Sequence, residues 1–390
     1  MAGTVPIITA GSISGMTGLK NRPVYFLKLN NSPTPNLVVK GEQGTDKNQK
    51  LNNEIKVSIQ WGSKLMKNVQ NNLVNTKIMD PNEANVFLQA AKAAFTAGTP
   101  QHNNVTAAAG SYNWVKMPYV ANLSDTDFLD EDTKNAKVDD AQTAIVKLAD
   151  EAVWRELGVV VAVDIFNGNN DRFVLKTGKW QNYGNIMFQM TPNPAVIGLD
   201  TFDGAGWDPE FSNGHANLVQ GDTYEELKIL NDPSLQRQFA EKCAKGVGTA
   251  FLQLFVSKYK WVKTVDKIEV RVTNGSGDEQ IGWVNKDNME DFYLPYADAF
   301  AQGLQTGSQR LKQYLQKKAK EYDRHNAGGM APARPSTPAP ALPHKKKHSM
   351  VSALSKLNPF KEKKKPQIIF HQRKLLPDGI EKRMRFLGWI

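Results

Sequence analysis

Short apolar runs bounded by polar turns alternate with stretches of helical periodicity over the first 325 residues. Apolar runs of about four to eight residues are typical of buried strands, whereas apolar residues about three to four positions apart predict helices. We interpret the run at 157–166 as a strand, and the end of a buried helix is the alternative. The other expected strands lie at 23–29, 36–40, 113–117, 186–189 and 195–199, with a possible strand pair at 267–272 and 280–284. Helices are expected at 52–73, 82–97, 139–158 (with Gly158 as its stop), 222–231, 233–258 and 288–324.

Polar residues that suit phosphoryl transfer lie at the ends of three of these runs. The first run leads into a polar turn with Asp171 and Arg172, Asn185 precedes the next, and Asp200 ends the third. We expect the strand ends to converge on one rim, where a rigid scaffold usually places chemistry. In such a site one carboxylate orients the attacking hydroxyl, while an amide and a second carboxylate hold magnesium on the nucleotide phosphates. An Asp–Arg pair in a polar turn is also a common surface pair, and that alternative stays open.

The ordered set NNDR, GNIMF and VIGLD resembles the catalytic core of the actin-fragmin kinase family and, more distantly, of the phosphoinositide kinases. The resemblance implies an α+β, bilobal protein-kinase-like fold, with a small β-rich N-lobe at 1–116 and a larger helical C-lobe at 117–325. It also implies transfer of the γ-phosphoryl group of ATP, with Mg²⁺, to a Ser or Thr hydroxyl of a protein, which could be cytoskeletal. Asp171 would then position the acceptor beside Arg172, while Asn185 and Asp200 would bind the metal.

The chain departs from most kinases in the spacing of these motifs. Asn185 lies 14 positions after Asp171, so VLKTGKWQNYG is inserted between them. The actin-fragmin kinase type tolerates such an insertion. Lipid phosphorylation, transfer of AMP by a pseudokinase, and an inactive scaffold acting through a basic tail remain alternative functions.

The front of the chain supplies candidates for nucleotide binding. Ser12, Ser14 and Gly15 lie in a Gly/Ser-rich segment whose backbone N–H groups could approach phosphate oxygens, although an ordinary hairpin turn has the same composition. Lys40 ends the strand at 36–40 and would reach the α and β phosphates of the nucleotide. A lysine at a strand end is more often only solvated.

Two further features are typical of the N-terminal part of a kinase. Glu54 lies in the first turn of the helix at 52–73 and would fix Lys40 by an ion pair, a role for which Glu42 competes. The backbone at Met117 and Tyr119 resembles the hinge that meets the adenine edge, and a plain strand followed by a proline is the alternative.

Charge separates the body of the chain from its end. The net charge is +10, and residues 326–390 contribute +11 of it, from 14 Lys and Arg against three acids. A Pro/Ala-rich linker opens this part, which we expect to be a disordered basic tail. Such a tail could bind an anionic membrane, nucleic acid or an acidic protein face, or it could only be solvated.

Composition sets the expected compartment. One cysteine, Cys243, allows no intramolecular disulfide, and the N-terminus lacks the pattern of a signal peptide. The longest apolar run is too short to span a bilayer. We therefore expect a cytoplasmic protein, with a membrane surface as one place of action, and delivery into another cell's cytosol stays open.

Overall fold

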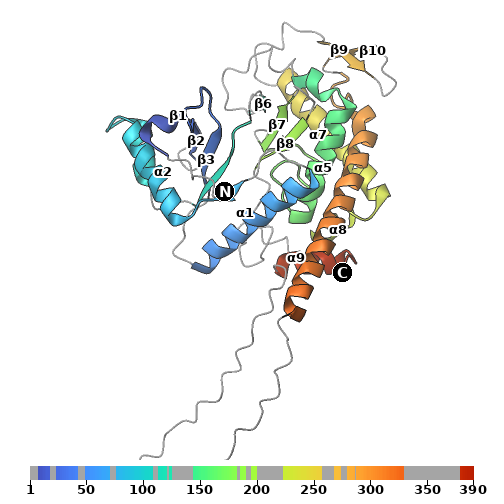
Figure 1. Cartoon of the computed structure of the whole chain (residues 1–390). Coiled ribbons are helices and arrows are strands. Elements are labelled where there is room, and N and C mark those ends of the chain that lie inside the picture. The colour runs from blue at the N-terminus through green and yellow to red at the C-terminus, as the bar shows by residue number, and fades with distance from the viewer. Residues whose placement is uncertain are drawn as a thin grey trace, which may run out of the picture. The chain divides into compact units, whose positions relative to one another are not determined.

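A computed structural model of the chain gives an α+β fold, with a small antiparallel sheet near the N-terminus followed by a helical part (Figure 1). The chain divides into two compact units, residues 1–316 with 377–390, and residues 317–376. The structure describes residues 8–17, 23–42, 49–70, 76–108, 113–120, 123–124, 144–181, 185–189, 195–199, 223–256, 268–273, 279–285, 287–328 and 378–390.

The N-terminal sheet has five strands in the order β1-β2-β3-β5-β4, and every neighbouring pair is antiparallel. The prediction of a strand at 36–40 is confirmed, although the strand continues beyond Lys40 to Glu42. A short 3-10 helix, η1 (Ala10–Ser12), precedes the sheet. The strands are β1 (Ile13–Thr17), β2 (Val24–Leu27), β3 (Leu37–Glu42), β4 (Lys77–Ile78) and β5 (Asn113–Pro118).

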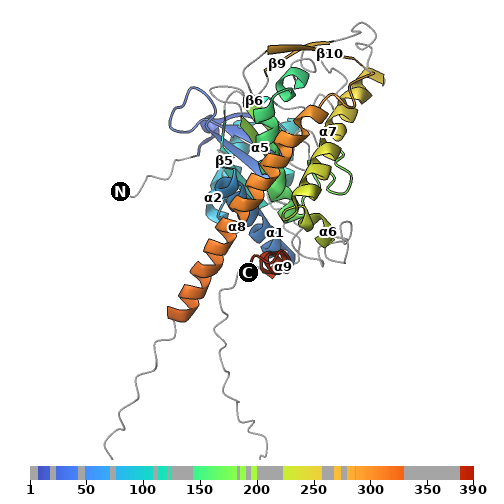
Figure 2. The same ribbon diagram turned by 90° about the vertical axis from the view of Figure 1, so that its right-hand side faces the viewer.

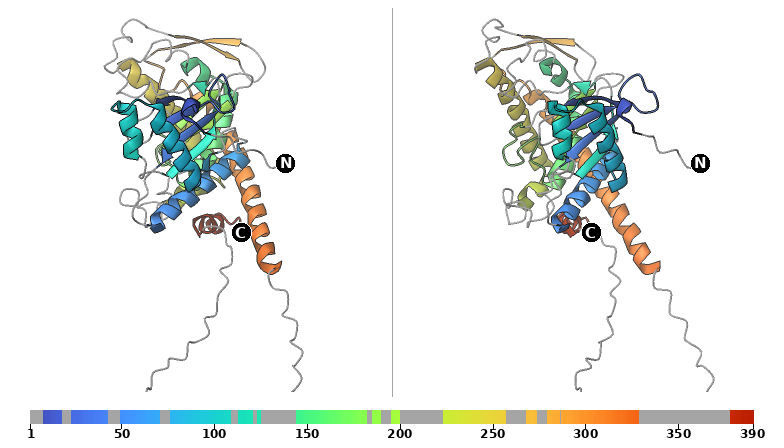
Figure 3. Two further views of the ribbon diagram at one scale, coloured as in Figure 1. Left: turned by 60° about the vertical axis from the view of Figure 1, so that its left-hand side comes forward. Right: turned by 90° about the vertical axis from the view of Figure 1, so that its left-hand side faces the viewer.

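Helices cover both faces of this sheet. On one face Tyr25, Val39 and Trp114 pack with Phe87 of α2 (Pro81–Ala94), the Tyr25 and Phe87 rings being 5.1 Å apart. Figure 3 shows the sheet from the side of α2 and α3 (Pro100–Ala108). On the other face Val115 packs with Ile59 of α1 (Gln49–Val69). Because successive residues of a strand point to opposite faces, Lys40, which follows Val39 and pairs with Val115, lies on the α1 face.

The second part of the fold combines a small sheet with long helices. The sheet has the order β6-β7-β8, with Ile186 of β7 opposite Gly198 of β8. A separate antiparallel pair, β9 with β10, confirms the strand pair predicted at 267–284. The elements are β6 (Leu123–Ser124), α5 (Glu151–Asn167), β7 (Ile186–Gln189), β8 (Ala195–Gly198), α6 (Thr223–Lys228), α7 (Pro233–Val256), β9 (Ile268–Thr273), β10 (Glu279–Val284), η8 (Leu294–Tyr296), α8 (Ala297–Gly328) and α9 (Asp378–Phe386).

Helix α5 corrects the main expectation from sequence. The run 157–166 is helical rather than a strand, and Gly158 does not end the helix. A Cβ on Gly158 would lie 2.8 Å from the backbone nitrogen of Leu304, so this glycine permits close packing against α8. Every residue of α5 from Leu157 to Asn167 is buried. A helix buried all round carries no polar stripe, and its apolar run therefore looks like a strand.

The C-terminal end of the chain corrects a second expectation. Residues 378–390 belong to the compact unit formed with 1–316, and Ile380 and Met384 are fully buried. Figure 2 shows α9 in red below α6, and the contacts of this segment include Asn231 after α6. The prediction of a disordered tail reaching to residue 390 is therefore wrong for its last residues, while 329–377 lie outside the described residues.

The remaining organisation follows from the described helices. The described part of the second unit is the end of α8, where Lys318 donates to Glu321 over 2.7 Å. No helix in the described ranges combines the length and apolar character needed to cross a bilayer. The division of the body into lobes at residues 116 and 117 stays a prediction.

Candidate functional site

A tight loop after α5 carries the predicted Asp171 and Arg172. Gly168 ends the helix in the left-handed conformation (φ 70°), and its N–H donates to the carbonyls of Asp164 and Ile165. The N–H of Asn169 also donates to the Asp164 carbonyl, over 2.9 Å. The last turn of α5 thus fixes the backbone direction of the loop through ordinary capping bonds.

Arg172 forms a fully buried ion pair with Asp164, the only acidic residue in the apolar run of α5. Its Nε donates to Asp164 Oδ2 over 2.6 Å and its Nη2 to Oδ1 over 2.5 Å, with the two side chains 0% and 1% exposed. Burial raises the pKa of the Asp164 carboxyl, while the Arg172 guanidinium and the hydrogen bonds from Arg172 and Asn169 oppose the rise. The alternative of a surface pair is therefore wrong for Arg172.

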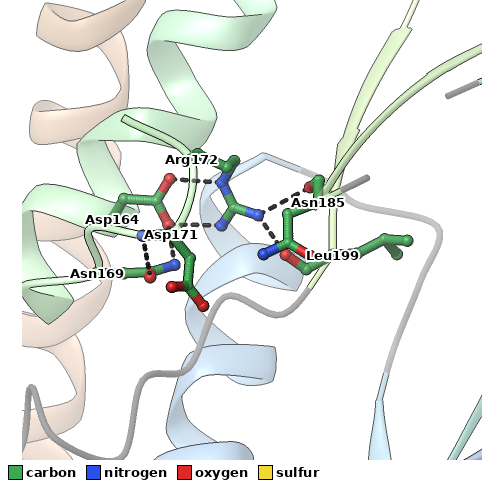
Figure 4. A network of polar contacts seen from close by, with 6 residues as sticks. All are labelled: Asp164, Asn169, Asp171, Arg172, Asn185 and Leu199. Carbon is green, nitrogen blue, oxygen red and sulfur yellow. Dashed lines mark hydrogen bonds and ion pairs between the residues drawn. The ribbon is translucent and has the colours of Figure 1, made fainter. Parts of the chain in front are cut away.

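The remaining guanidinium nitrogen, Nη1, joins the loop to the small sheet. Arg172 Nη1 donates to the carbonyl of Asn185, over 3.0 Å, and to that of Leu199. The N–H of Leu199 in turn donates to the Asn185 carbonyl, over 2.9 Å. Figure 4 shows one guanidinium meeting the end of α5, the start of β7 and the end of β8. Described residues of all three sequence motifs thus contact one side chain, while Asp200, which follows Leu199, lies outside the described residues.

Asp171 is positioned by its neighbours in the same loop. Its backbone N–H donates to Asn169 Oδ1 over 3.0 Å, and Asn169 Nδ2 donates to Asp164 Oδ1 over 3.0 Å. Figure 4 shows the Asp171 carboxylate pointing away from the Arg172 guanidinium. Asp164 therefore orders both Arg172 and, through Asn169, the backbone of Asp171.

The predicted metal ligands differ in how far the structure describes them. Asn185 is 6% exposed, and its Nδ2 has no hydrogen-bond partner within the described ranges. Asp200 lies outside the described residues. Among described residues no group of three or more His, Cys, Asp or Glu side chains could hold a metal ion. Amide and carboxylate oxygens are nevertheless ligands that Mg²⁺ accepts together with waters and phosphates.

The insertion between Asp171 and Asn185 folds back as a hairpin in its described part. Phe173 pairs with Trp180, and the N–H of Gln181 donates to the Arg172 carbonyl over 3.0 Å. Asn170 holds this hairpin from the loop, because its Oδ1 accepts from the N–H of Leu175 and its carbonyl accepts from Gln181 Nε2. The inserted residues therefore support the loop.

A close contact with α7 fixes the tip of that hairpin. Gly178 has a positive φ of 71°, and a Cβ there would lie 2.6 Å from Lys242 Cβ. Only glycine satisfies both the backbone angle and the approach. The insertion thus has a defined place against α7.

The predicted phosphate-binding segment lies in η1 and β1. Ser12 Oγ accepts from the N–H of Thr9 over 3.2 Å, and Ser14 Oγ donates to the Phe26 carbonyl over 3.0 Å. Gly15 pairs with Phe26 across the sheet. These three residues lie in a 3-10 helix and a strand, and their role in phosphate binding stays a prediction. The connection at 18–22 between β1 and β2 lies outside the described residues.

The other nucleotide candidates lie on or beside the N-terminal sheet. Lys40 is half-buried on the α1 face, and Glu54 lies on α1, where its side chain is outside the described residues, as is that of Glu42. Met117 pairs with Val38 in the sheet. The N–H of Tyr119 donates to the Asn36 carbonyl over 3.2 Å, so this group is already engaged.

Helix α1 links the Lys40 face of the sheet to the Arg172 cluster, which consists of Arg172 and its partners Asp164, Asn169, Asn185 and Leu199. Ile59 packs on Val115, whereas seven residues later Met66 reaches Gly198: a Cβ on Gly198 would lie 3.2 Å from Met66 Cε and 3.4 Å from Arg172 Cζ. Gln70 Nε2 donates to the Val196 carbonyl of β8. One helix therefore packs both on the sheet face that carries Lys40 and on the strand that ends beside Arg172.

The end of α1 is held by two side chains from α5 and α8. Arg310 Nη1 donates to the Val69 carbonyl over 3.0 Å. Burial raises the pKa of Glu156, and the charge of Arg310 and a hydrogen bond with Gln70 oppose the rise. These contacts fix the position of α1 relative to the Arg172 cluster.

None of three comparisons, with family models, with curated proteins and with solved structures, yields a match. The resemblance to kinases therefore depends on the motifs in the chain, and the site must be judged from its own geometry.

Sequence reasoning missed Asp164, one of the residues that order the loop. Asn169 and Asn170, which make the other contacts, belong to the NNDR motif and lie in the polar turn that the sequence predicted. Asp164 had a usable signal, because a carboxylate within an apolar run requires a partner once it is buried. The nearest basic residue after the run is Arg172.

Proposed function

We propose that the chain is an ATP- and Mg²⁺-dependent phosphotransferase with a bilobal, protein-kinase-like arrangement. The observation that carries the proposal is the Arg172 guanidinium, which joins the Asp171 loop to the backbone of Asn185 and of Leu199. Described residues of three motifs, from Asp171 to Leu199, thereby lie around one side chain. That convergence is what a site for a metal-bound nucleotide and an acceptor requires.

Asp171 is the residue we assign to the acceptor. Its loop is held through Asn169 and Asp164, so its carboxylate could orient a hydroxyl and accept its proton. Arg172 keeps the loop in place and, being fully buried, acts as a positioning residue.

Asn185 and Asp200 are the residues we assign to magnesium. The metal, when bound, would neutralise charge on the nucleotide phosphates. An amide oxygen from Asn185 suits such an ion, and Nδ2 of the same side chain, which has no partner among the described residues, could donate to an oxygen of the ligand. A buried donor left without a partner costs about 1–3 kcal/mol, which favours the bound state.

Lys40 is the residue we assign to the phosphates. In kinases the corresponding lysine lies on a strand and pairs with a glutamate of the following helix. Here Lys40 lies on the face that α1 covers, and Glu54 lies on α1, with Glu42 as the competing partner. The acceptor that we propose, a protein Ser or Thr, follows from the resemblance to the actin-fragmin kinases.

Transfer from labelled ATP tests the proposal. The full-length protein should move label from [γ-³²P]ATP, with Mg²⁺, to itself or to a protein in a lysate, and none from [α-³²P]ATP. Asp171→Asn should abolish transfer, whereas Asp287→Asn, at an exposed acid distant in sequence, should leave it unchanged. Label from the α position alone would indicate AMP transfer, and equal transfer by wild type and Asp171→Asn would contradict the assignment.

A further inference from the structure

The C-terminal segment ends on an aromatic stack against α5. The Trp389 ring lies over the Phe166 ring, with centroids 5.8 Å apart and planes 2° from parallel. Trp389 is 2% exposed, and Phe166 is fully buried. The next residue, Ile390, is 45% exposed, so the buried part of this segment ends at the tryptophan.

Hydrogen bonds from two helical regions hold the same segment. Asn231, which follows α6, accepts from Trp389 Nε1 over 2.9 Å and donates from Nδ2 to the Leu387 carbonyl over 2.9 Å. Gln316 of α8 donates to the Trp389 carbonyl over 2.7 Å. The tryptophan is therefore fixed at its ring, its indole nitrogen and its backbone.

Phe166 belongs to the turn that holds the Asp171 loop. Asp164, two positions earlier, binds Arg172 and Asn169, and its carbonyl accepts from the N–H groups of Gly168 and Asn169. A change in the position of this turn would move the loop with it. The stack on Phe166 therefore lies one turn of helix away from the residues that position Asp171.

We infer that Trp389 is a positioning residue for the site: docked on Phe166, it holds the last turn of α5 and with it the Asp171 loop. This inference concerns catalysis and rests on the proposed phosphotransfer. The coupling between the C-terminus and the loop is a property of the fold that does not depend on the reaction. Small displacements of a catalytic group can cost up to about a hundredfold in rate, so a partial loosening should cost about tenfold.

Point variants of the full chain test the inference. Trp389→Ala removes the stack and the indole bond, Trp389→Phe keeps an aromatic ring, and Ile390→Ala is the matched control at an exposed neighbour. Asn231→Ala removes two hydrogen bonds without opening a cavity under the tryptophan. It tests the same inference if Trp389→Ala does not fold. Each variant is compared by hydrogen–deuterium exchange and by steady-state kinetics well below its melting temperature.

We expect faster amide exchange over residues 166–172 in Trp389→Ala and in Asn231→Ala, and wild-type exchange in Ile390→Ala. The kcat of Trp389→Ala should fall about tenfold with the KM for ATP unchanged, and Trp389→Phe should recover most of the loss. A purely structural role would lower the melting temperature and leave kcat per folded molecule unchanged, which would overturn the inference.

The exchange experiment also separates this inference from the proposed function. Exchange at 166–172 that does not respond to Trp389→Ala or Asn231→Ala overturns the coupling, whatever the activity. If wild type transfers no phosphoryl group and exchange does respond, the proposed function fails while the coupling stands.

Discussion

Two short polar segments, 11–15 near the N-terminus and 168–172 after α5, look alike in sequence and differ in what their side chains do. Both are rich in small or amide residues. In the first, Ser12 and Ser14 bond backbone groups nearby and the segment becomes part of η1 and β1. In the second, Asn169 and Arg172 form a buried network that reaches two other strands. Composition indicates a turn in both segments, but it does not indicate which segment has buried partners on several other elements.

Breaking the buried ion pair should have the largest effect. Arg172→Met leaves the Asp164 carboxylate buried without its partner, and we expect unfolding to become easier by about 3–5 kcal/mol. Chemical denaturation followed by circular dichroism measures this. In the double variant Asp164→Leu/Arg172→Met no unpaired charge remains, so much of the lost stability should return. If the single variant is as stable as wild type, the network is not what holds the loop.

Removing the Lys40 charge should lower the activity and leave the stability of the fold unchanged. Lys40→Met keeps the apolar stem and deletes the ammonium group, so the fold should remain while most transfer is lost. Melting temperature and rate are measured on the same preparation, with Lys92→Met, at an exposed position on α2, as the control. Unchanged turnover would mean that another residue contacts the phosphates, and Lys28 would be the first to test.

Substituting the serines of the first segment should lower phosphoryl transfer much less than substituting residues of the second segment. Ser14→Ala loses one exposed hydrogen bond to the Phe26 carbonyl, worth about 0.5–1.5 kcal/mol at most. We expect transfer within about twofold of wild type. A loss comparable to that of Asp171→Asn would show that the Ser14 hydroxyl contacts the nucleotide.

Glu156 should give a small pH dependence of stability. Burial raises its pKa above the ordinary value of 4.5, so the folded state binds its proton more tightly than the unfolded state. Glu156 therefore contributes fully to the stability of the folded state below pH 4.5. This contribution is lost as pH rises through the raised pKa. Glu156→Gln should unfold less readily than wild type at pH 7 and about equally at pH 4. The reverse order would mean that the charge of Arg310 dominates.

The basic segment before α9 gives a prediction that is independent of the site. Replacing Lys363, Lys364 and Lys365 by Gln should weaken binding to vesicles with anionic lipid by about 1 kcal/mol per charge, and more at low salt. Co-sedimentation at two salt concentrations measures this, with neutral vesicles as the control. Equal sedimentation of both proteins at low salt would exclude this run as a membrane contact.

The sequence predicted most elements that have a helical period or form a short apolar run between polar residues. The helices at 52–73 and 233–258 have amphipathic spacing, and the strands β7 and β8 are such apolar runs. The run 157–166 was misread because it is buried on all sides, and α9 was missed because Ile380 and Met384 lie in a strongly basic region. The partners of Arg172 could not be predicted, because they are backbone carbonyls whose approach depends on the packing of α1, α5 and β8.

Magnesium-dependent nucleotide binding is the sharpest test of the role assigned to Asn185. ATP affinity is measured by isothermal titration with Mg²⁺ and with EDTA, for wild type and for Asn185→Ala, which keeps the backbone carbonyl that binds Arg172. We predict that Mg²⁺ tightens binding by about tenfold or more in wild type and that Asn185→Ala loses this gain while still folding. Binding to wild type that is the same with and without Mg²⁺, or a full gain retained by Asn185→Ala, would contradict the account.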